Sequence, residues 1–235
     1  MTASGSKTEK TGDQVADATL AVPVWDLPVR LVHWGLVILI GFSWWSAENG
    51  EIEWHIRSGL AVLFLLLFRI AWGFLGSSTA RFHSFVAGPG KLAAYLRDPA
   101  GWRGIGHSPL GSLSVIALLS LITLQVGFGL PLSDEDGVVT GPLNRLVSFE
   151  TAEWAHDVHK WLFNLLLALI ALHVAAILFY RSRGKRLVRA MVTGRSLDYP
   201  AETRGMVAAG PARLAVCAAL AGAATWWVGQ GVPGL

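Results

Sequence analysis

Long apolar segments alternate with short polar loops along this chain. Four segments approach the roughly 20 residues that a helix needs to cross a bilayer, and a shorter, alanine-rich segment follows near the C-terminus. The five segments cover residues 31–47, 56–75, 113–132, 153–180 and 212–228. The pattern predicts an all-α integral membrane protein, with a four-helix transmembrane bundle and a fifth, C-terminal transmembrane helix.

The polar stretches predict how the chain is divided. Residues 1–22 are rich in Thr, Ser, Ala, Lys and Asp and lack the apolar core of a signal peptide, so we expect a disordered leader. The four-helix domain is expected over residues 23–197. A linker and the fifth helix are expected over residues 198–235.

The charges of the loops predict an orientation. Basic residues gather before the first segment, after the second and after the fourth, whereas the other two loops are acidic. The basic residues are Lys7, Lys10, Arg30, Arg81, Lys91, Arg97, Arg103, Arg181, Arg183, Lys185, Arg186, Arg189 and Arg195, and the acidic ones are Glu48, Glu51, Glu53, Asp134, Glu135 and Asp136. The positive-inside rule then places the N-terminus in the cytoplasm and the two acidic loops outside.

Composition supports a membrane protein and excludes several other classes. A mean hydropathy of +0.48 with 15% charged residues is too apolar for an ordinary soluble fold. The net charge of +3 is small and its basic residues flank apolar segments, so no nucleic-acid partner is indicated. Cys217 is the single cysteine, which excludes an intramolecular disulfide, a paired-cysteine metal site and covalent haem attachment. Many of the eleven tryptophans end apolar runs, as in interfacial aromatic belts; examples are Trp44, Trp45, Trp72, Trp226 and Trp227.

Several histidines lie in or at the edge of the apolar segments, where an ionisable group is costly and indicates function. His159 and His173 are fourteen residues apart, so they share one helix face and differ by roughly 21 Å in depth. The predicted topology places His55 beside His159 near the outer surface and His33 beside His173 near the inner one. Two imidazoles at one depth can ligate a haem iron from both sides, so this spacing predicts two stacked haems.

Other histidines offer alternatives. His156 competes with His159, but it would lie about 100° from His173 around the helix, against about 40° for His159. We therefore prefer His159, and whether His156 substitutes for it stays open. His83 and His107 fall in the second loop and are interpreted as surface or quinone-site residues. A single helical histidine is also often only a packing or capping residue.

Arg69 and several glycines add to the haem hypothesis. Arg69 follows His55 by fourteen residues and needs an anionic partner, and the segments contain no internal Asp or Glu to supply one. A haem propionate would fit; alternatively, the arginine side chain reaches the cytoplasmic interface. Gly59, one turn after His55, would give a flat macrocycle room. Gly127 and Gly129 could do the same or simply pack helices.

These residues stand in runs that resemble the prokaryotic cytochrome b561 family, which includes the b-type cytochrome subunits of membrane hydrogenases. The runs are VWDLPVRLVHWGLV, WHIRSGLAVLFLLLFRIAWGF, GHSPLGSL and HKWLFNLLLALIALHVAAILFY, within about residues 23–197. The resemblance implies a four-helix core in the bacterial inner membrane and two b haems. By motif match the iron ligands are His33, His55, His159 and His173.

The resemblance leaves three hypotheses for the function. The first is an electron-transfer subunit between the quinone pool and a redox partner, such as cytochrome c or a hydrogenase- or dehydrogenase-type subunit. The second is a self-standing oxidoreductase, for example a superoxide:quinone oxidoreductase. The third is a non-redox scaffold or transporter whose histidines relay protons. Relays usually also use acidic residues within the membrane, and here these occur only at the outer end of the fourth segment, as Glu153 and Asp157.

Overall fold

Five long helices dominate the computed structural model, which describes residues 21–200 and 202–233. They are α2 (Leu27–Glu48), α3 (Ile52–Leu75), α6 (Pro109–Gly129), α7 (Phe149–Ser182) and α9 (Pro211–Gly229). Each is long and apolar enough to cross a membrane. The predicted all-α fold with five membrane helices is therefore confirmed. The predicted disordered leader lies, as far as residue 20, outside the described residues.

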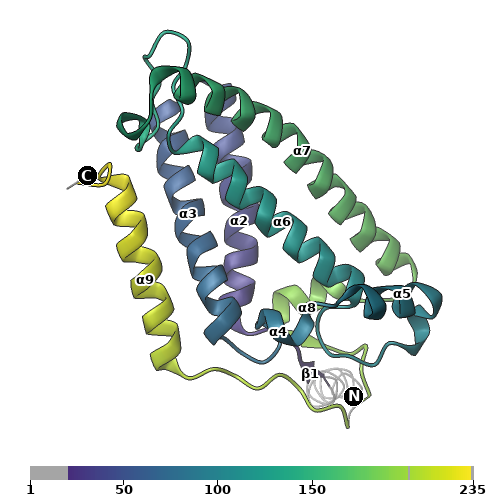
Figure 1. Cartoon of the computed structure of the whole chain (residues 1–235). Coiled ribbons are helices and arrows are strands. Elements are labelled where there is room, and N and C mark those ends of the chain that lie inside the picture. The colour runs from purple at the N-terminus through teal and green to yellow at the C-terminus, as the bar shows by residue number, and fades with distance from the viewer. Residues whose placement is uncertain (1–20, 201, 234–235) are drawn as a thin grey trace, which may run out of the picture.

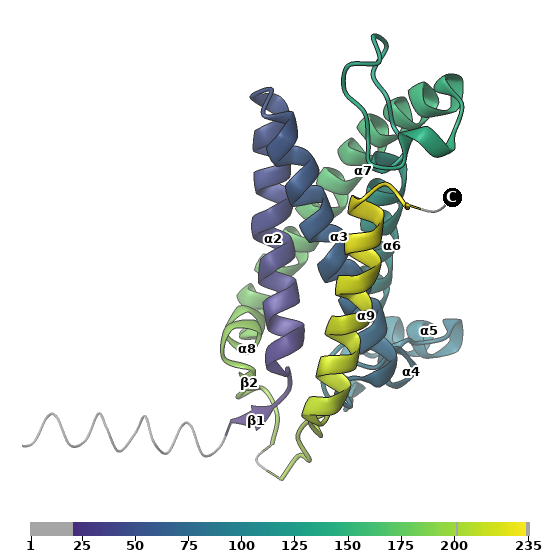
Figure 2. The ribbon, with the colours of Figure 1, turned by 90° about the vertical axis from the view of Figure 1, so that its left-hand side faces the viewer.

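The helices form a bundle (Figure 1, Figure 2). The short helices α4, α5 and α8 lie at one end of it, and the loop between α6 and α7 lies at the other. Helix α3 packs against α2, α6 and α9, and α7 packs mainly on α6. We name the two ends after the histidines that lie there: α3 and α7 begin at the His55 end, and α2 begins at the His33 end. The remaining elements are α4 (Phe82–Phe85), α5 (Pro89–Arg97), η1 (Pro99–Gly101), η2 (Asn144–Leu146), α8 (Leu187–Thr193), β1 (Val22–Pro23) and β2 (Arg195–Ser196).

Polar caps decide where the long helices begin. The side chains of Asp26, Ser108 and Ser148 accept hydrogen bonds from backbone N–H groups in the first turns of α2, α6 and α7. These helices start four residues before the apolar segments do, because a capping side chain satisfies the free N–H groups of the first turn. Helix α6 ends at Gly129 rather than at residue 132, since Pro131 cannot continue it.

Leucines from α3 and α7 form the centre of the core. Leu66 and Leu166 are each 2% exposed, and Leu162 is also buried. The core is continuous with buried residues of α2, α6 and α9. Tryptophans 44, 45, 226 and 227 are exposed on the bundle surface as expected of an aromatic belt. Trp72 is not part of such a belt, because it is buried and its indole N–H donates to Asp26 over 2.8 Å.

Helix α9 packs against α3 through small side chains. Cys217 and Ala221 are buried in this contact, and Gly229 lies close to the side chain of Leu60. Small residues let two helix backbones approach closely, as membrane helices often do. Beyond α9, the guanidinium of Arg145 donates hydrogen bonds to the carbonyls of Gly231 and Val232. The loop before α7 thus holds the end of α9.

Candidate haem-binding site

His55 and His159 face each other at the His55 end of the bundle. Helix α3 positions His55 in its first turn, and α7 positions His159 in its third. Their ring centroids are 6.1 Å apart and the rings are nearly perpendicular, at 86°. An imidazole nitrogen lies about 2 Å from a bound transition metal and the ring centre about 1 Å further, so two axial imidazoles on one metal have centres about 6 Å apart. The observed spacing fits ligation of one iron by both rings.

Backbone carbonyls orient both rings. His55 Nδ1 lies 2.8 Å from the carbonyl oxygen of Ser43 on α2, and His159 Nδ1 lies 2.8 Å from that of Gln125 on α6. A carbonyl oxygen can only accept, so each Nδ1 carries the proton and each Nε2 keeps its lone pair. The side-chain amide of Gln125, 3.1 Å from His159 Nε2, donates to that lone pair. Both histidines therefore hold the tautomer that ligates a metal through Nε2.

The two rings line a cavity of about 600 Å³, within the size range of ligand sites. Gly59 on α3 also lines it, and a Cβ added there would meet no atom within 4 Å. Gly129 on α6 lines the opposite wall, where a Cβ would lie 2.9 Å from the His159 ring. Glycine at these two positions keeps space for a flat group and room for the imidazole.

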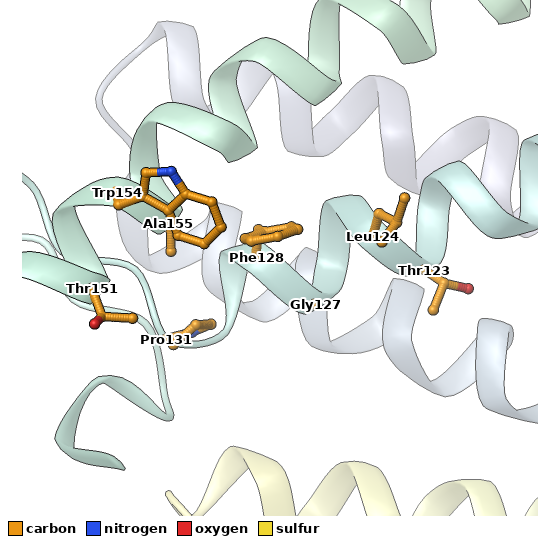
Figure 3. Close-up of a pocket in the computed structure, with 8 residues that line it drawn as sticks. All are labelled: Thr123, Leu124, Gly127, Phe128, Pro131, Thr151, Trp154 and Ala155. Atoms are coloured by element: carbon orange, nitrogen blue, oxygen red, sulfur yellow. The ribbon is translucent and has the colours of Figure 1, made fainter. Parts of the chain in front are cut away.

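Gly127 lies elsewhere, although it was a candidate for the same role. It lines a smaller, apolar pocket of about 350 Å³ between α6 and α7, beside the edge-to-face pair of Phe128 and Trp154 (Figure 3). His156 does line the large cavity, as does Lys160 one turn later. The ring that contacts His55 is that of His159. The geometry thus favours His159 over His156, as rotation around the helix predicts.

The second pair lies at the His33 end. His33 on α2 and His173 on α7 are close enough to interact electrostatically. His173 Nδ1 lies 3.2 Å from the Ser114 hydroxyl of α6. His33 Nδ1 is buried and has no hydrogen-bond partner among the described residues. The structure thus brings together both predicted pairs, and their surroundings differ.

Arg69 points into the protein at the His33 end. It is 5% exposed, donates to the carbonyl of Ala80 over 3.3 Å and lies over the Phe82 ring at 5.2 Å. The alternative that this side chain reaches the interface is wrong, because α4 and the loop before it cover the guanidinium. The apolar segments supply no anion for Arg69, but the residue that caps the first helix does. The buried carboxylate of Asp26, just before the apolar segment, interacts with Arg69 electrostatically.

The other polar candidates have separate surroundings. His107 is half-buried, with its ring centroid 4.5 Å from both Trp25 and Phe85. Burial and the charge of Arg69 lower the pKa of His107 to about 3, so the imidazole is neutral. His83 on α4 is exposed, and Ser108 caps α6.

Three residues that orient the histidines were not singled out from the sequence: Ser43, Ser114 and Gln125. Ser114 and Gln125 are polar residues inside an apolar segment, and this signal could have identified them. Ser43 and Gln125 act through backbone carbonyls, which every residue has, so no side-chain pattern marks that role.

The histidines therefore occur as two pairs on three helices, and the part of the chain described contains no group of three or more His, Cys, Asp or Glu residues placed to hold a metal ion. Comparison with known families agrees with this arrangement: the prokaryotic cytochrome b561 family matches residues 24–194. The chain belongs to the prokaryotic cytochrome b561 family. No similar curated protein and no similar solved structure was found.

The cytochrome b561 match covers all four paired histidines and ends before α9. It confirms the resemblance and identifies a multi-pass membrane protein that carries electrons with haem b. The residues at the His55 end fit such a group: two oriented imidazoles, a cavity between them and a glycine that leaves it open. The hypothesis of a non-redox scaffold is not supported, because the family is one of electron carriers.

Proposed function

We propose that this cytochrome b561 binds two b haems and carries electrons across the bilayer, between the quinone pool and a redox protein partner. His55 and His159 would hold one haem, and His33 and His173 the other. The observation that carries the proposal is the presence of a histidine pair at each end of the bundle, with one member of each pair on α7. Bound haem supplies an iron that accepts and releases one electron.

The protein's own residues suit electron transfer rather than chemistry at an open metal. His55 with His159, and His33 with His173, would each hold an iron through two imidazoles, which would leave no open position and disfavour oxygen binding. The Nδ1 hydrogen bonds to Ser43 and Gln125 fix the ring orientation at the His55 end. At the His33 end, Arg69 supplies the positive charge that a haem propionate would require.

Apolar packing separates the two proposed haem sites. The fourteen residues from His159 to His173 correspond to roughly 21 Å of helix. Leu162 and Leu166, which lie between them on α7, are buried in the core with Leu66. Such packing excludes water, so an electron can cross without a charged side chain moving through the bilayer.

The proposed setting follows from the charges of the loops. In the bacterial inner membrane, the His33 end would face the cytoplasm, where the basic loops lie, and the His55 end would face outside. A partner such as cytochrome c or a hydrogenase- or dehydrogenase-type subunit would then exchange electrons at the membrane surface. The family match indicates a haem b electron carrier and names no partner. The identity of the partner is therefore part of the proposal.

Haem counting tests the proposal. A reduced-minus-oxidised spectrum of the purified protein should show two low-spin b haems per chain. We expect His159→Leu and His173→Leu each to retain one haem, because each removes one axial ligand from a different pair. His156→Leu is the matched control, one turn from His159 in the same cavity, and should retain both. Two haems in His159→Leu, or one in His156→Leu, would contradict the assignment.

A further inference from the structure

The two histidine pairs differ in the hydrogen bonds made by their Nδ1 atoms. At the His55 end, both Nδ1 atoms lie 2.8 Å from a backbone carbonyl oxygen. At the His33 end, His173 Nδ1 lies 3.2 Å from the hydroxyl of Ser114. His33 Nδ1 has no hydrogen-bond partner in the described part of the chain. In the tautomer that would bind iron through Nε2, one pair therefore has two carbonyl acceptors, and the other has a single hydroxyl acceptor at a longer distance.

This difference has a consequence for any iron bound through Nε2. When Nδ1–H donates to a strong acceptor, the imidazole becomes a better electron donor at Nε2. A more basic ligand stabilises ferric iron more than ferrous iron, because the ferric ion carries the larger charge. Hydrogen bonding of the axial ligands is one of the means by which a protein sets a haem potential. Weaker acceptors therefore favour the reduced state.

We propose that the haem at the His33 end has the higher reduction potential of the two, and that Ser114 sets this potential through its hydrogen bond to His173. The inference rests on the proposed dihaem function and adds an order to its two centres. A single electron added to the protein then resides mainly at the His33 end. Its transfer oxidises the ferrous iron at the His55 end and reduces the ferric iron at the His33 end, with no bond broken and no proton moved.

Other charges act on the same potentials and must be separated from the hydrogen bond. Glu48, His156 and Lys160 line the cavity at the His55 end. At the other end, Arg69 and Asp26 form the buried charged pair described above. Replacing Ser114 alters none of these charges. Ser114 is thus the position at which the contribution of the hydrogen bond can be measured by itself.

Redox titration of the purified protein in detergent, followed by haem absorbance, tests this. The wild type should show two components. The reduction potential of the haem at the His33 end should be higher by at least 59 mV, which corresponds to a tenfold equilibrium constant for one electron. The His159→Leu variant, which should keep the haem at the His33 end, assigns the components. We expect Ser114→Ala to raise the potential at the His33 end further. The shift should correspond to a threefold to tenfold change in the equilibrium constant for electron transfer between the two haems, roughly the effect of one hydrogen bond.

Two matched variants separate a potential-setting role from a purely structural one. Ser114→Thr keeps a hydroxyl and should restore the wild-type potential. Ser120→Ala removes an exposed serine from the same helix and should change neither potential. If Ser114→Ala loses the haem, the order of the two wild-type potentials still tests whether the haem at the His33 end has the higher one.

The outcomes also distinguish this inference from the proposed function. Fewer than two haems in the wild type would overturn the proposed function itself. Two haems with equal potentials, or with the lower potential at the His33 end, would overturn the inference and leave the function standing. Two haems with a Ser114→Ala titration identical to that of the wild type would exclude Ser114 as the determinant.

Discussion

At the scale of single residues, the surroundings of each histidine decide what it can do. His107 shows this most clearly outside the histidine pairs. Its ring lies between Trp25 and Phe85, near Arg69, and both burial and the positive charge lower its pKa to about 3. An unfolded chain would bind a proton on this histidine below a pH of about 6.5. The folded protein does not, so acid favours unfolding.

Replacing His107 should therefore flatten the acid dependence of stability. Between pH values of about 6.5 and 3 the unfolded state binds one proton more than the folded state at this residue. The free energy of unfolding then falls by about 1.4 kcal/mol for each pH unit of acidification, or about 2 kcal/mol from pH 6.5 to 5. Melting temperatures of wild type and His107→Gln at several pH values measure this. The exposed His83→Gln is the control, and an unchanged slope in His107→Gln would contradict the prediction.

The histidine pairs show how far single residues can be interpreted from sequence. His33, His55, His159 and His173 stand out because an ionisable group in an apolar run needs a reason. Their pairing follows from helix geometry and loop charge. The carbonyl of Ser43 that orients His55 could not be predicted, because its position depends on how α2 packs against α3. The partners of Arg69 were missed for a similar reason, since a separate loop folds back to cover it.

At the scale of elements, α9 differs from the other long helices. It lies outside the region that matches the cytochrome b561 family, and it contacts the bundle mainly through α3. Its two ends are held by arginines: Arg213 donates to the carbonyl of Leu75, and Arg145 donates to the carbonyls after α9. These contacts stabilise a helix whose own side chains are mostly small.

Removing the Arg145 contacts should loosen α9. Hydrogen bonds from a charged donor contribute about 1.5–3 kcal/mol when buried, and less here because Arg145 is exposed, so we expect a loss of about 1–2 kcal/mol in Arg145→Met. Cys217 is fully buried between α3 and α9 and reports on their separation. Its reaction rate with a maleimide should rise roughly 5- to 30-fold.

The matched control is Arg57→Met. Arg57 forms an exposed ion pair with Glu53 on α3, and such pairs contribute little. Its Cys217 labelling rate should equal that of the wild type. Equal rates in Arg145→Met and wild type would show that the contacts after α9 do not hold the helix.

Long apolar segments predict the long elements well and leave the short ones unpredicted. All five long helices were expected, but α6 was placed too far along because the apolar run continues past Pro131. The short helices α4, α5 and α8 were not predicted. They contain four, nine and seven residues, too few to form an apolar segment of membrane-spanning length.

At the scale of the whole molecule, the proposed orientation has a direct test. Asp136, between α6 and α7, and Glu202, between β2 and α9, are both exposed. The loop between α6 and α7 and the segment that leads from β2 to α9 lie at opposite ends of the bundle (Figure 1). With the His55 end outside, a membrane-impermeant maleimide should label Asp136→Cys in intact spheroplasts. Glu202→Cys should react only after the membrane is permeabilised. Buried Cys217 should give little background in either variant. The reverse labelling pattern would overturn the orientation.

The small sheet at the His33 end holds the two ends of the family-matched region together. β1 and β2 pair Val22 with Ser196 and Pro23 with Arg195, on either side of the region that matches the family. The two ends of the cytochrome unit therefore meet at one point. A unit whose ends are adjacent can be joined to further segments, inserted into another chain or circularly permuted with little disturbance of its interior. Helix α9 follows this junction, so the chain leaves the matched region at the point where that region also begins.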